Sequence, residues 1–145
     1  MSQITGLHHV TCIAGDAQEN VDFYSGVLGM RLVKKSVNQD SPGTYHLFYA
    51  DAVGHPGSDL TFFPWPEMAV ARAGTGLSME VSLAIPAGTL EFWSHRLTEL
   101  GVAHQPLEPR RGSRALPFAD PHGLHHTLAE TGDTREFTPW LESPV

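Results

Sequence analysis

The feature that most constrains this chain is an internal repeat of one strand, one helix and three further strands. The two helix-ending glycines, Gly29 and Gly101, lie 72 positions apart, and His9 and Glu80, at matching points of the two first strands, lie 71 apart. A repeat of this length indicates two copies of one supersecondary unit, neither of which can bury its sheet face alone. We therefore expect an α+β fold of two βαβββ modules, each with one helix on the outer face of its sheet.

The alternation of apolar residues and the turn residues between the runs predict the individual elements. In the first copy, strands are expected at 7–14, 30–37, 44–49 and 58–63, with a helix over 17–28 that Asp16 caps. In the second copy, strands are expected at 77–85, 102–104, 113–118 and 124–130, with a helix over 89–100. The resulting organisation is a first module at 1–64, a connector at 65–75, a second module at 76–131 and a tail or linker at 132–145.

Charge and composition exclude several classes of protein. A net charge of −7, from 16 acidic against 9 basic residues, argues against a nucleic-acid-binding surface, and the basic doublets at 34–35 and 110–111 are expected to be solvated. No apolar run approaches the ~20 residues of a membrane helix, and the first ten residues lack the pattern of a secretion signal. The single cysteine, Cys12, cannot form an internal disulfide, which favours the reducing cytoplasm.

Strand alternation gathers polar side chains on one face of each module. In the first module this face carries His9, Thr11, Asp59, Thr61 and Phe63, and in the second it carries Glu80, Ser82, His125, Thr127 and Ala129. Because a face this polar is costly to bury dry, we expect it to line a wet cleft or a metal site, with His9 and Glu80 on one concave surface and His8 and Met79 pointing away. An imidazole and a carboxylate suit iron, manganese, zinc or nickel, with water completing the shell. The alternative is an ordinary strand histidine and a carboxylate at the sheet rim.

The remaining histidines are sorted by the same alternation. His125 is expected to face the cleft, and His126 to face the opposite side with Leu124 and Leu128. His46 lies in a strand that could flank the cleft, where it either lines a pocket or is an ordinary strand histidine. The others lie in turns or on a helix and are expected to be solvated: His55, His95, His104 and His122.

Several stretches resemble a known family. GLHHVT at 6–11, GDAQENVDFY at 15–24 and GVLGMRLVKK at 26–35 resemble the vicinal oxygen chelate superfamily, which contains glyoxalases, bleomycin-resistance proteins and extradiol dioxygenases. YHL at 45–47, PGS at 56–58 and LTFFP at 60–64 are similar to the hydroquinone-type ring-cleaving dioxygenases of that superfamily. The resemblance covers about residues 6–130 and is most specific over 6–64.

This resemblance implies a cupped mixed sheet around a divalent metal, usually iron(II), that binds two oxygens of an aromatic diol. The first ligand carries over to His9, and the other ligand positions fall at Thr61, Glu80 and Thr127. Of these three only Glu80 is a strong donor, and the two threonines stand where glutamates are usual. Thr11, His46, Ser82 and His125 would join Thr61 and Thr127 in lining the pocket. With so few ligands, the isolated chain is expected to be metal-free or weakly loaded.

The leading hypothesis for function is a metal-dependent, ring-cleaving dioxygenase-family protein that acts on a small aromatic molecule. Dioxygenases of this branch are longer, so the chain would be an N-terminal half that lacks its C-terminal half, or a short relative that forms a homodimer. A metal-free binding module like the bleomycin-resistance proteins is the first alternative, which the two threonines favour. The second is a glyoxalase-like isomerase in which Glu80 serves as ligand or base.

Overall fold

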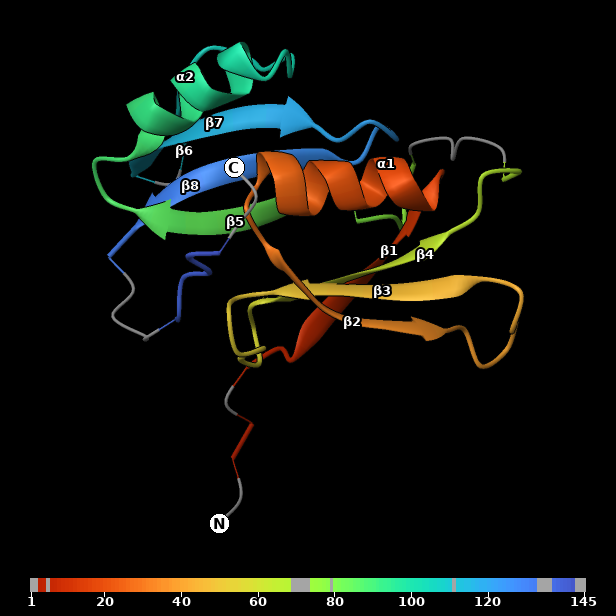
Figure 1. Cartoon of the computed structure of the whole chain (residues 1–145). Coiled ribbons are helices and arrows are strands. Elements are labelled where there is room, and N and C mark those ends of the chain that lie inside the picture. Colours follow the sequence, from red (N-terminus) through yellow and green to blue (C-terminus); the bar gives the residue numbers. More distant parts are fainter. Residues whose placement is uncertain are drawn as a thin grey trace. The chain divides into compact units, whose positions relative to one another are not determined.

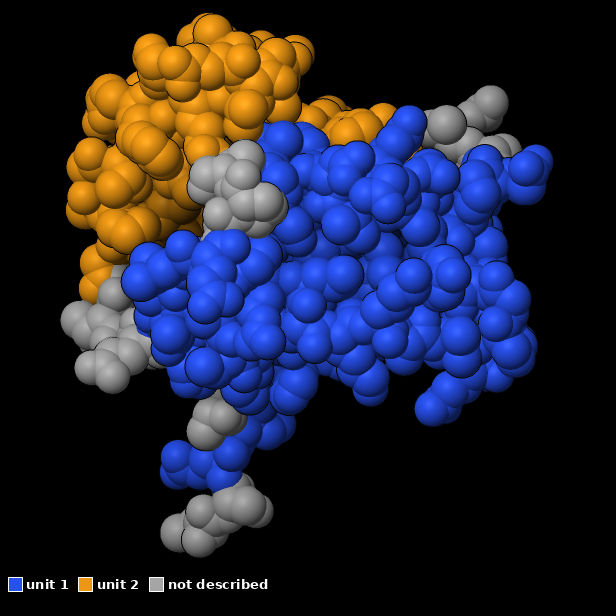
Figure 2. Space-filling view, in the orientation of Figure 1, with its two compact units in different colours: residues 1–69, 136–145 blue, residues 70–135 orange. Residues whose placement is uncertain are grey.

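The structure of the chain is a computed structural model. It describes residues 3–4, 6–68, 74–78, 80–110, 112–132 and 137–142. It divides into two compact units, of which unit 1 comprises residues 1–69 and 136–145 and unit 2 comprises residues 70–135 (Figure 2). Each unit contains a four-stranded mixed sheet, which confirms the predicted α+β pair of βαβββ modules. Within the described part of the chain, no helix has the length and apolar character that crossing a lipid bilayer requires.

Unit 1 follows the predicted order of elements (Figure 1). Its elements are β1 (His9–Ala14), α1 (Ala17–Val21), the π-helical turn η1 (Asp22–Val27), β2 (Arg31–Val37), β3 (Tyr45–Ala50) and β4 (Asp59–Pro64). The strand order in the sheet is β1-β4-β3-β2, with β1 parallel to β4 and the other pairs antiparallel. The Asp16 carboxylate caps α1, and Gly29 follows the helical segment with a φ of 68°, a left-handed conformation that glycine adopts without steric cost.

Unit 2 repeats this arrangement. Its elements are β5 (Val81–Pro86), α2 (Leu90–Glu99), β6 (Glu108–Arg110), β7 (Ser113–Ala119) and β8 (His125–Thr131), in the sheet order β5-β8-β7-β6. The strand predicted at 102–104 is wrong, since only His104 forms an isolated bridge there and the edge strand is β6. Pro109 lies within β6, where an edge strand tolerates its missing N–H, and its presence removes the usual sequence signal for a strand.

An apolar cluster on the helix side of the unit 1 sheet determines which face is left for polar groups. Tyr24 from η1 packs against Tyr49 of β3 and Phe62 of β4, with ring centroids 5.2 and 4.5 Å away, and all three side chains are fully buried. The Tyr49 hydroxyl donates a 2.8 Å hydrogen bond to Asn20 Oδ1, which satisfies the polar end of that ring in the core. The opposite face of the sheet therefore carries the polar side chains.

The described segment 137–142 contacts the loop between β3 and β4 of unit 1. The Thr138 amide donates to Asp51 Oδ2 at 2.9 Å, and the Ala52 amide donates to the Thr138 carbonyl at 2.8 Å. Phe137 packs edge-on against His55, whose imidazole pairs with Asp51 at 2.5 Å instead of being free in solvent as expected. The loop between β3 and β4 thus holds the segment 137–142 in place.

We predict that unit 2 loses stability in mild acid because of a buried histidine. His126 is fully buried, its ring stacks on Phe118 at 5.4 Å, and burial lowers its pKa below the ordinary value. The unfolded chain therefore binds a proton more readily, so the stability that neutral His126 gives is present above the ordinary histidine pKa and lost as the pH falls below it. In urea unfolding at about pH 7 and about pH 5, His126→Phe should weaken this pH dependence. His125→Phe, at the exposed neighbouring residue, is the control and should keep the pH dependence of the wild-type chain. Equal pH dependence in all three proteins would contradict the prediction.

Candidate functional site

The strand register of unit 1 brings the predicted polar residues onto one face. His9 lies opposite Asp59 and Thr11 lies opposite Thr61 across the parallel pair β1–β4. Thr61 in turn lies opposite Phe48 of β3, so three strands contribute to the same surface. We call this surface, consisting of His9, Thr11, His46, Phe48, Asp59, Thr61 and Phe63, the polar face of unit 1.

A chain of hydrogen bonds crosses the polar face at His46. Its Nε2 lies 3.1 Å from the hydroxyl oxygen of Thr61, which is fully buried and donates at 2.9 Å to the hydroxyl of the exposed Thr11. The imidazole lies between the rings of Phe48 and Phe63, with centroids 4.0 and 4.1 Å away. Burial, followed by the positive potential of nearby His9 and Lys34, lowers the pKa of His46. The neutral imidazole is therefore favoured at this position.

His9 is exposed at the start of β1, and His8 lies beside it instead of pointing away. The two Nδ1 atoms are 3.1 Å apart, and His8 Nδ1 is 3.8 Å from Asp59 Oδ2. Alternation does not constrain His8, because that residue precedes the first strand residue. Burial raises the pKa of Asp59, and the nearby imidazoles of His8 and His9 oppose that shift. The buried Oδ1 of Asp59 accepts no hydrogen bond from the described residues. Met79, the other residue expected to point away, lies outside the described residues.

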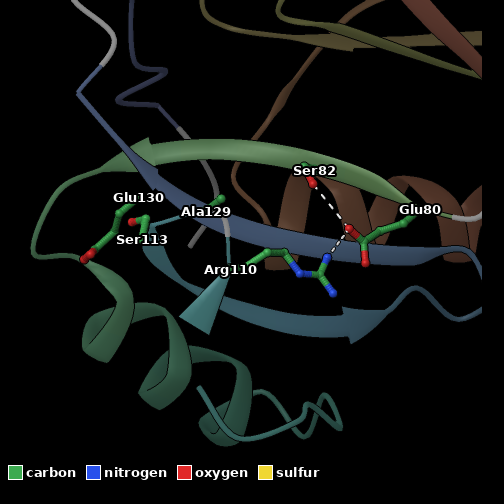
Figure 3. Close-up of a pocket in the computed structure, with 6 residues that line it drawn as sticks. All are labelled: Glu80, Ser82, Arg110, Ser113, Ala129 and Glu130. Carbon is green, nitrogen blue, oxygen red and sulfur yellow. Dashed lines mark hydrogen bonds and ion pairs between the residues drawn. The ribbon is translucent and has the colours of Figure 1, made fainter. Parts of the chain in front are cut away.

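In unit 2, the corresponding polar side of the sheet carries Arg110 together with Glu80. The Arg110 guanidinium forms an ion pair with Glu80 (Figure 3). It also pairs with Glu108 at 2.8 Å and donates to the Thr127 hydroxyl at 3.1 Å. Ser82 also donates to Glu80, at 3.3 Å, and lies opposite Thr127 just as Thr11 lies opposite Thr61. The hydrogen bond from Arg110, more than any other contact, holds the pKa of Glu80 below its ordinary value.

These groups border a pocket of about 330 Å³ within unit 2. Its lining residues, drawn in Figure 3, are Glu80, Ser82, Arg110, Ser113, Ala129 and Glu130. Arg110, expected to be solvated, is partly exposed but also paired with Glu80 and Glu108, while Arg111 lies outside the described residues. Arg110 could not be recognised as a site residue from the sequence, because no strand is predicted at 108–110 and the pairing of β6 with β7 brings Arg110 onto this face. His125 is exposed at the start of β8 and does not line this pocket.

We predict that Arg110→Met returns the pKa of Glu80 upward towards the ordinary value of a glutamate. The charge-assisted hydrogen bond that stabilises the carboxylate is lost, and the hydroxyl of Ser82 replaces only a small part of it. The free energy of unfolding should change little, because both partners are partly exposed to solvent. A carboxyl-carbon NMR titration measures the shift, and Arg114→Met, which breaks the exposed pair with Glu91, is the matched control. An unchanged Glu80 titration would contradict the prediction.

The described residues do not fit a complete divalent-metal site. Of the four positions that the resemblance implied as ligands, Glu80 is held by Arg110, and Thr61 and Thr127 offer neutral hydroxyls that are already hydrogen-bonded. His9 is left as the one strong donor of that set without a competing cation. Across the described ranges, no group of three histidine, cysteine, aspartate or glutamate side chains is arranged to hold a metal ion. A non-haem iron site of the two-histidine, one-carboxylate type needs more than this.

Comparison with known proteins gives a consistent family. The model of the Glyoxalase/Bleomycin resistance protein/Dioxygenase superfamily matches residues 6–143. MhqO of Bacillus subtilis (strain 168), whose name assigns it to the ring-cleaving dioxygenases, is 46% identical over 125 residues, 86% of this chain and 40% of that protein. The chlorohydroquinone/hydroquinone 1,2-dioxygenase of Sphingobium indicum is 34% identical over 145 residues, 98% of this chain and 45% of that protein. The chain thus spans less than half the length of these relatives.

Solved structures agree with this grouping. A Bacillus subtilis structure titled as a dioxygenase superposes with a TM-score of 0.85 at 44% identity, over 90% of this chain and 42% of that one. A glyoxalase family protein from Enterococcus faecalis superposes with a TM-score of 0.71 at 23% identity, over 87% of this chain and 98% of that one, and supports the fold alone.

Proposed function

The chain belongs to the glyoxalase/bleomycin resistance protein/dioxygenase superfamily, and on that basis we propose that it forms part of a ring-cleaving dioxygenase acting on a hydroquinone-type diol. The observation that carries the proposal is the similarity along 98% of the chain to a relative named as a chlorohydroquinone/hydroquinone 1,2-dioxygenase. The polar face of unit 1 supports it, because the same sheet face carries exposed His9, partly exposed aromatic rings and hydrogen-bonded hydroxyl groups.

In this proposal unit 1 binds the substrate, and His9 is one ligand of a metal centre. The metal is proposed to be iron(II), with manganese, zinc or nickel as alternatives, and the isolated chain is proposed to be metal-free or weakly loaded. The missing donors would come from a second copy in a homodimer or from further modules such as those that make up the rest of the longer relatives. The single cysteine is consistent with a cytoplasmic setting.

One observation favours a second candidate, a metal-free module that binds a small molecule. The Glu80 carboxylate is paired with Arg110 at the edge of the unit 2 pocket. The Arg110 guanidinium therefore already neutralises this implied ligand. The same pair argues against the isomerase hypothesis, because a carboxylate with a lowered pKa is a weak general base.

The proposal is tested with a chimera. This chain replaces the matching residues of the Sphingobium indicum dioxygenase, so that the remaining part of that relative supplies the other modules. Oxygen uptake is then measured with hydroquinone, with and without added iron(II), for the chimera and for the chain alone. We expect iron-dependent turnover by the chimera and little by the chain alone.

Two outcomes would contradict it in different ways. A folded chimera that binds iron as the relative does, yet leaves hydroquinone intact, would refute the dioxygenase function and favour the binding module. Near-stoichiometric iron and hydroquinone turnover in the chain alone would keep the function but refute the need for further donors.

A further inference from the structure

The hydrogen-bond chain on the polar face determines which nitrogen of His46 carries a proton. The Thr61 hydroxyl has one hydrogen, and it is donated to the Thr11 oxygen at 2.9 Å. The contact of 3.1 Å between Thr61 and His46 Nε2 therefore requires Nε2–H to be the donor. With the proton on Nε2, Nδ1 of a neutral imidazole is an unprotonated acceptor.

The Nδ1 atom is available to a ligand. Among the described residues Nδ1 has no hydrogen-bond partner. It does not belong to the fully buried polar atoms that lack a partner, so solvent or a ligand can reach it. Phe48 and Phe63 both pack against the imidazole ring, and the contact of Nε2 with Thr61 orients it. A fixed acceptor is thus presented at the polar face.

The surroundings of this acceptor are aromatic. Phe48 and Phe63 are each only partly buried, and the row of rings continues from Phe63 to Trp65, 5.7 Å away. Exposed ring surface favours a planar aromatic ligand, and a lone acceptor favours a ligand that carries a donor.

We propose that His46 Nδ1 accepts a hydrogen bond from a phenolic hydroxyl of an aromatic ligand bound on the polar face of unit 1. This inference rests on the proposed function, and it deepens that function by naming the group that recognises the hydroxyl. It makes His46 a specificity-determining residue, because an ether of the same shape would leave the acceptor unpaired. No proton transfer is required, since the imidazole only accepts the hydrogen bond.

Two substitutions separate the two nitrogens. The side chain in His46→Gln can place an amide N–H near the position of Nε2 and keep the bond to Thr61, but it has no acceptor at the Nδ1 position. The side chain in His46→Asn can place its carbonyl oxygen near the position of Nδ1 and keep the acceptor. The pair therefore matches size and polarity while removing one function at a time.

Binding of hydroquinone and of 1,4-dimethoxybenzene to the full chain is measured anaerobically and without metal, by Trp65 fluorescence or NMR. The wild-type chain is expected to prefer hydroquinone by about tenfold, the glutamine variant to lose this preference, and the asparagine variant to keep most of it. Nitrogen-15 NMR of His46 in the free chain should report the Nε2–H tautomer.

An undiminished preference in His46→Gln, an Nδ1–H tautomer, or no binding of hydroquinone by the wild-type chain would overturn the inference. Selective binding by the chain together with an inactive chimera would instead refute the proposed function alone. An active chimera in which the glutamine variant retains its preference would refute only the role of His46.

Discussion

In the chimera, His9→Ala is expected to lower the rate of hydroquinone cleavage by at least about 100-fold, because loss of residues that merely support a metal ligand already costs 10- to 100-fold. His9 is the one strong donor, among the positions implied as ligands, that neither an internal cation nor a buried hydrogen bond occupies. Its side chain is exposed, so its loss leaves no dry cavity, and the free energy of unfolding should change by less than about 0.5 kcal/mol.

The measurements are the turnover rate, the bound iron per chain and the urea midpoint. His95→Ala serves as the control, because His95 is an exposed histidine on α2 in unit 2 that pairs with nearby Glu99. The control should leave turnover and iron content unchanged. An alanine variant at position 9 with undiminished turnover would remove His9 from the centre and leave the metal hypothesis without a ligand in this chain.

The fold could be predicted because its signals are local and occur twice. Alternation marks β1 and β5, glycine ends each helical segment, and the same parallel register places Thr11 opposite Thr61 and Ser82 opposite Thr127. In a repeat each weak sequence signal occurs twice, so an error in one predicted element does not change the predicted architecture. This is why a misplaced edge strand left the predicted modules intact.

The groups that modify the candidate site could not be predicted in the same way. The pairing of Arg110 with Glu80 depends on the register of β6, a three-residue strand containing proline and no apolar alternation. The position of the segment 137–142 depends on hydrogen bonds to the Asp51 carboxylate, 87 positions earlier, and to the Ala52 amide beside it. Such contacts leave no periodic trace in a sequence. Long-range polar contacts therefore escaped the sequence analysis, although the residues involved were visible in it.

The Asp51 carboxylate joins two distant parts of unit 1, and Asp51→Ala is expected to lower its free energy of unfolding by about 3 kcal/mol. Oδ1 accepts from the amides of Val53, Gly54 and His55, while Oδ2 accepts from the Thr138 amide and the His55 imidazole. The side chain is only 8% exposed, so water cannot readily replace these partners. Hydrogen bonds to a charged acceptor are individually stronger than neutral ones, and several are lost together.

The same contacts give the effect a defined dependence on pH. Burial alone would raise the pKa of Asp51, but the hydrogen bonds from His55, Thr138 and Val53 outweigh burial and hold that pKa well below the ordinary value. Because the folded pKa lies below the unfolded one, the stabilisation is complete above the ordinary aspartate pKa and is lost as the pH falls below it. The wild-type chain should therefore lose more stability between about pH 7 and about pH 3 than the alanine variant does.

Urea unfolding at the two pH values and hydrogen exchange at the Thr138 amide together measure this role. The variant should show faster exchange at Thr138, because that amide donates to the missing carboxylate. Asp40→Ala is the matched control, since Asp40 is an exposed aspartate in the loop between β2 and β3 of the same unit, and it should leave the exchange rate of Thr138 unchanged. Equal stability of the Asp51→Ala and wild-type chains at about pH 7, with Thr138 still protected, would mean that the segment 137–142 is held by Ala52 and the Phe137 ring without the carboxylate.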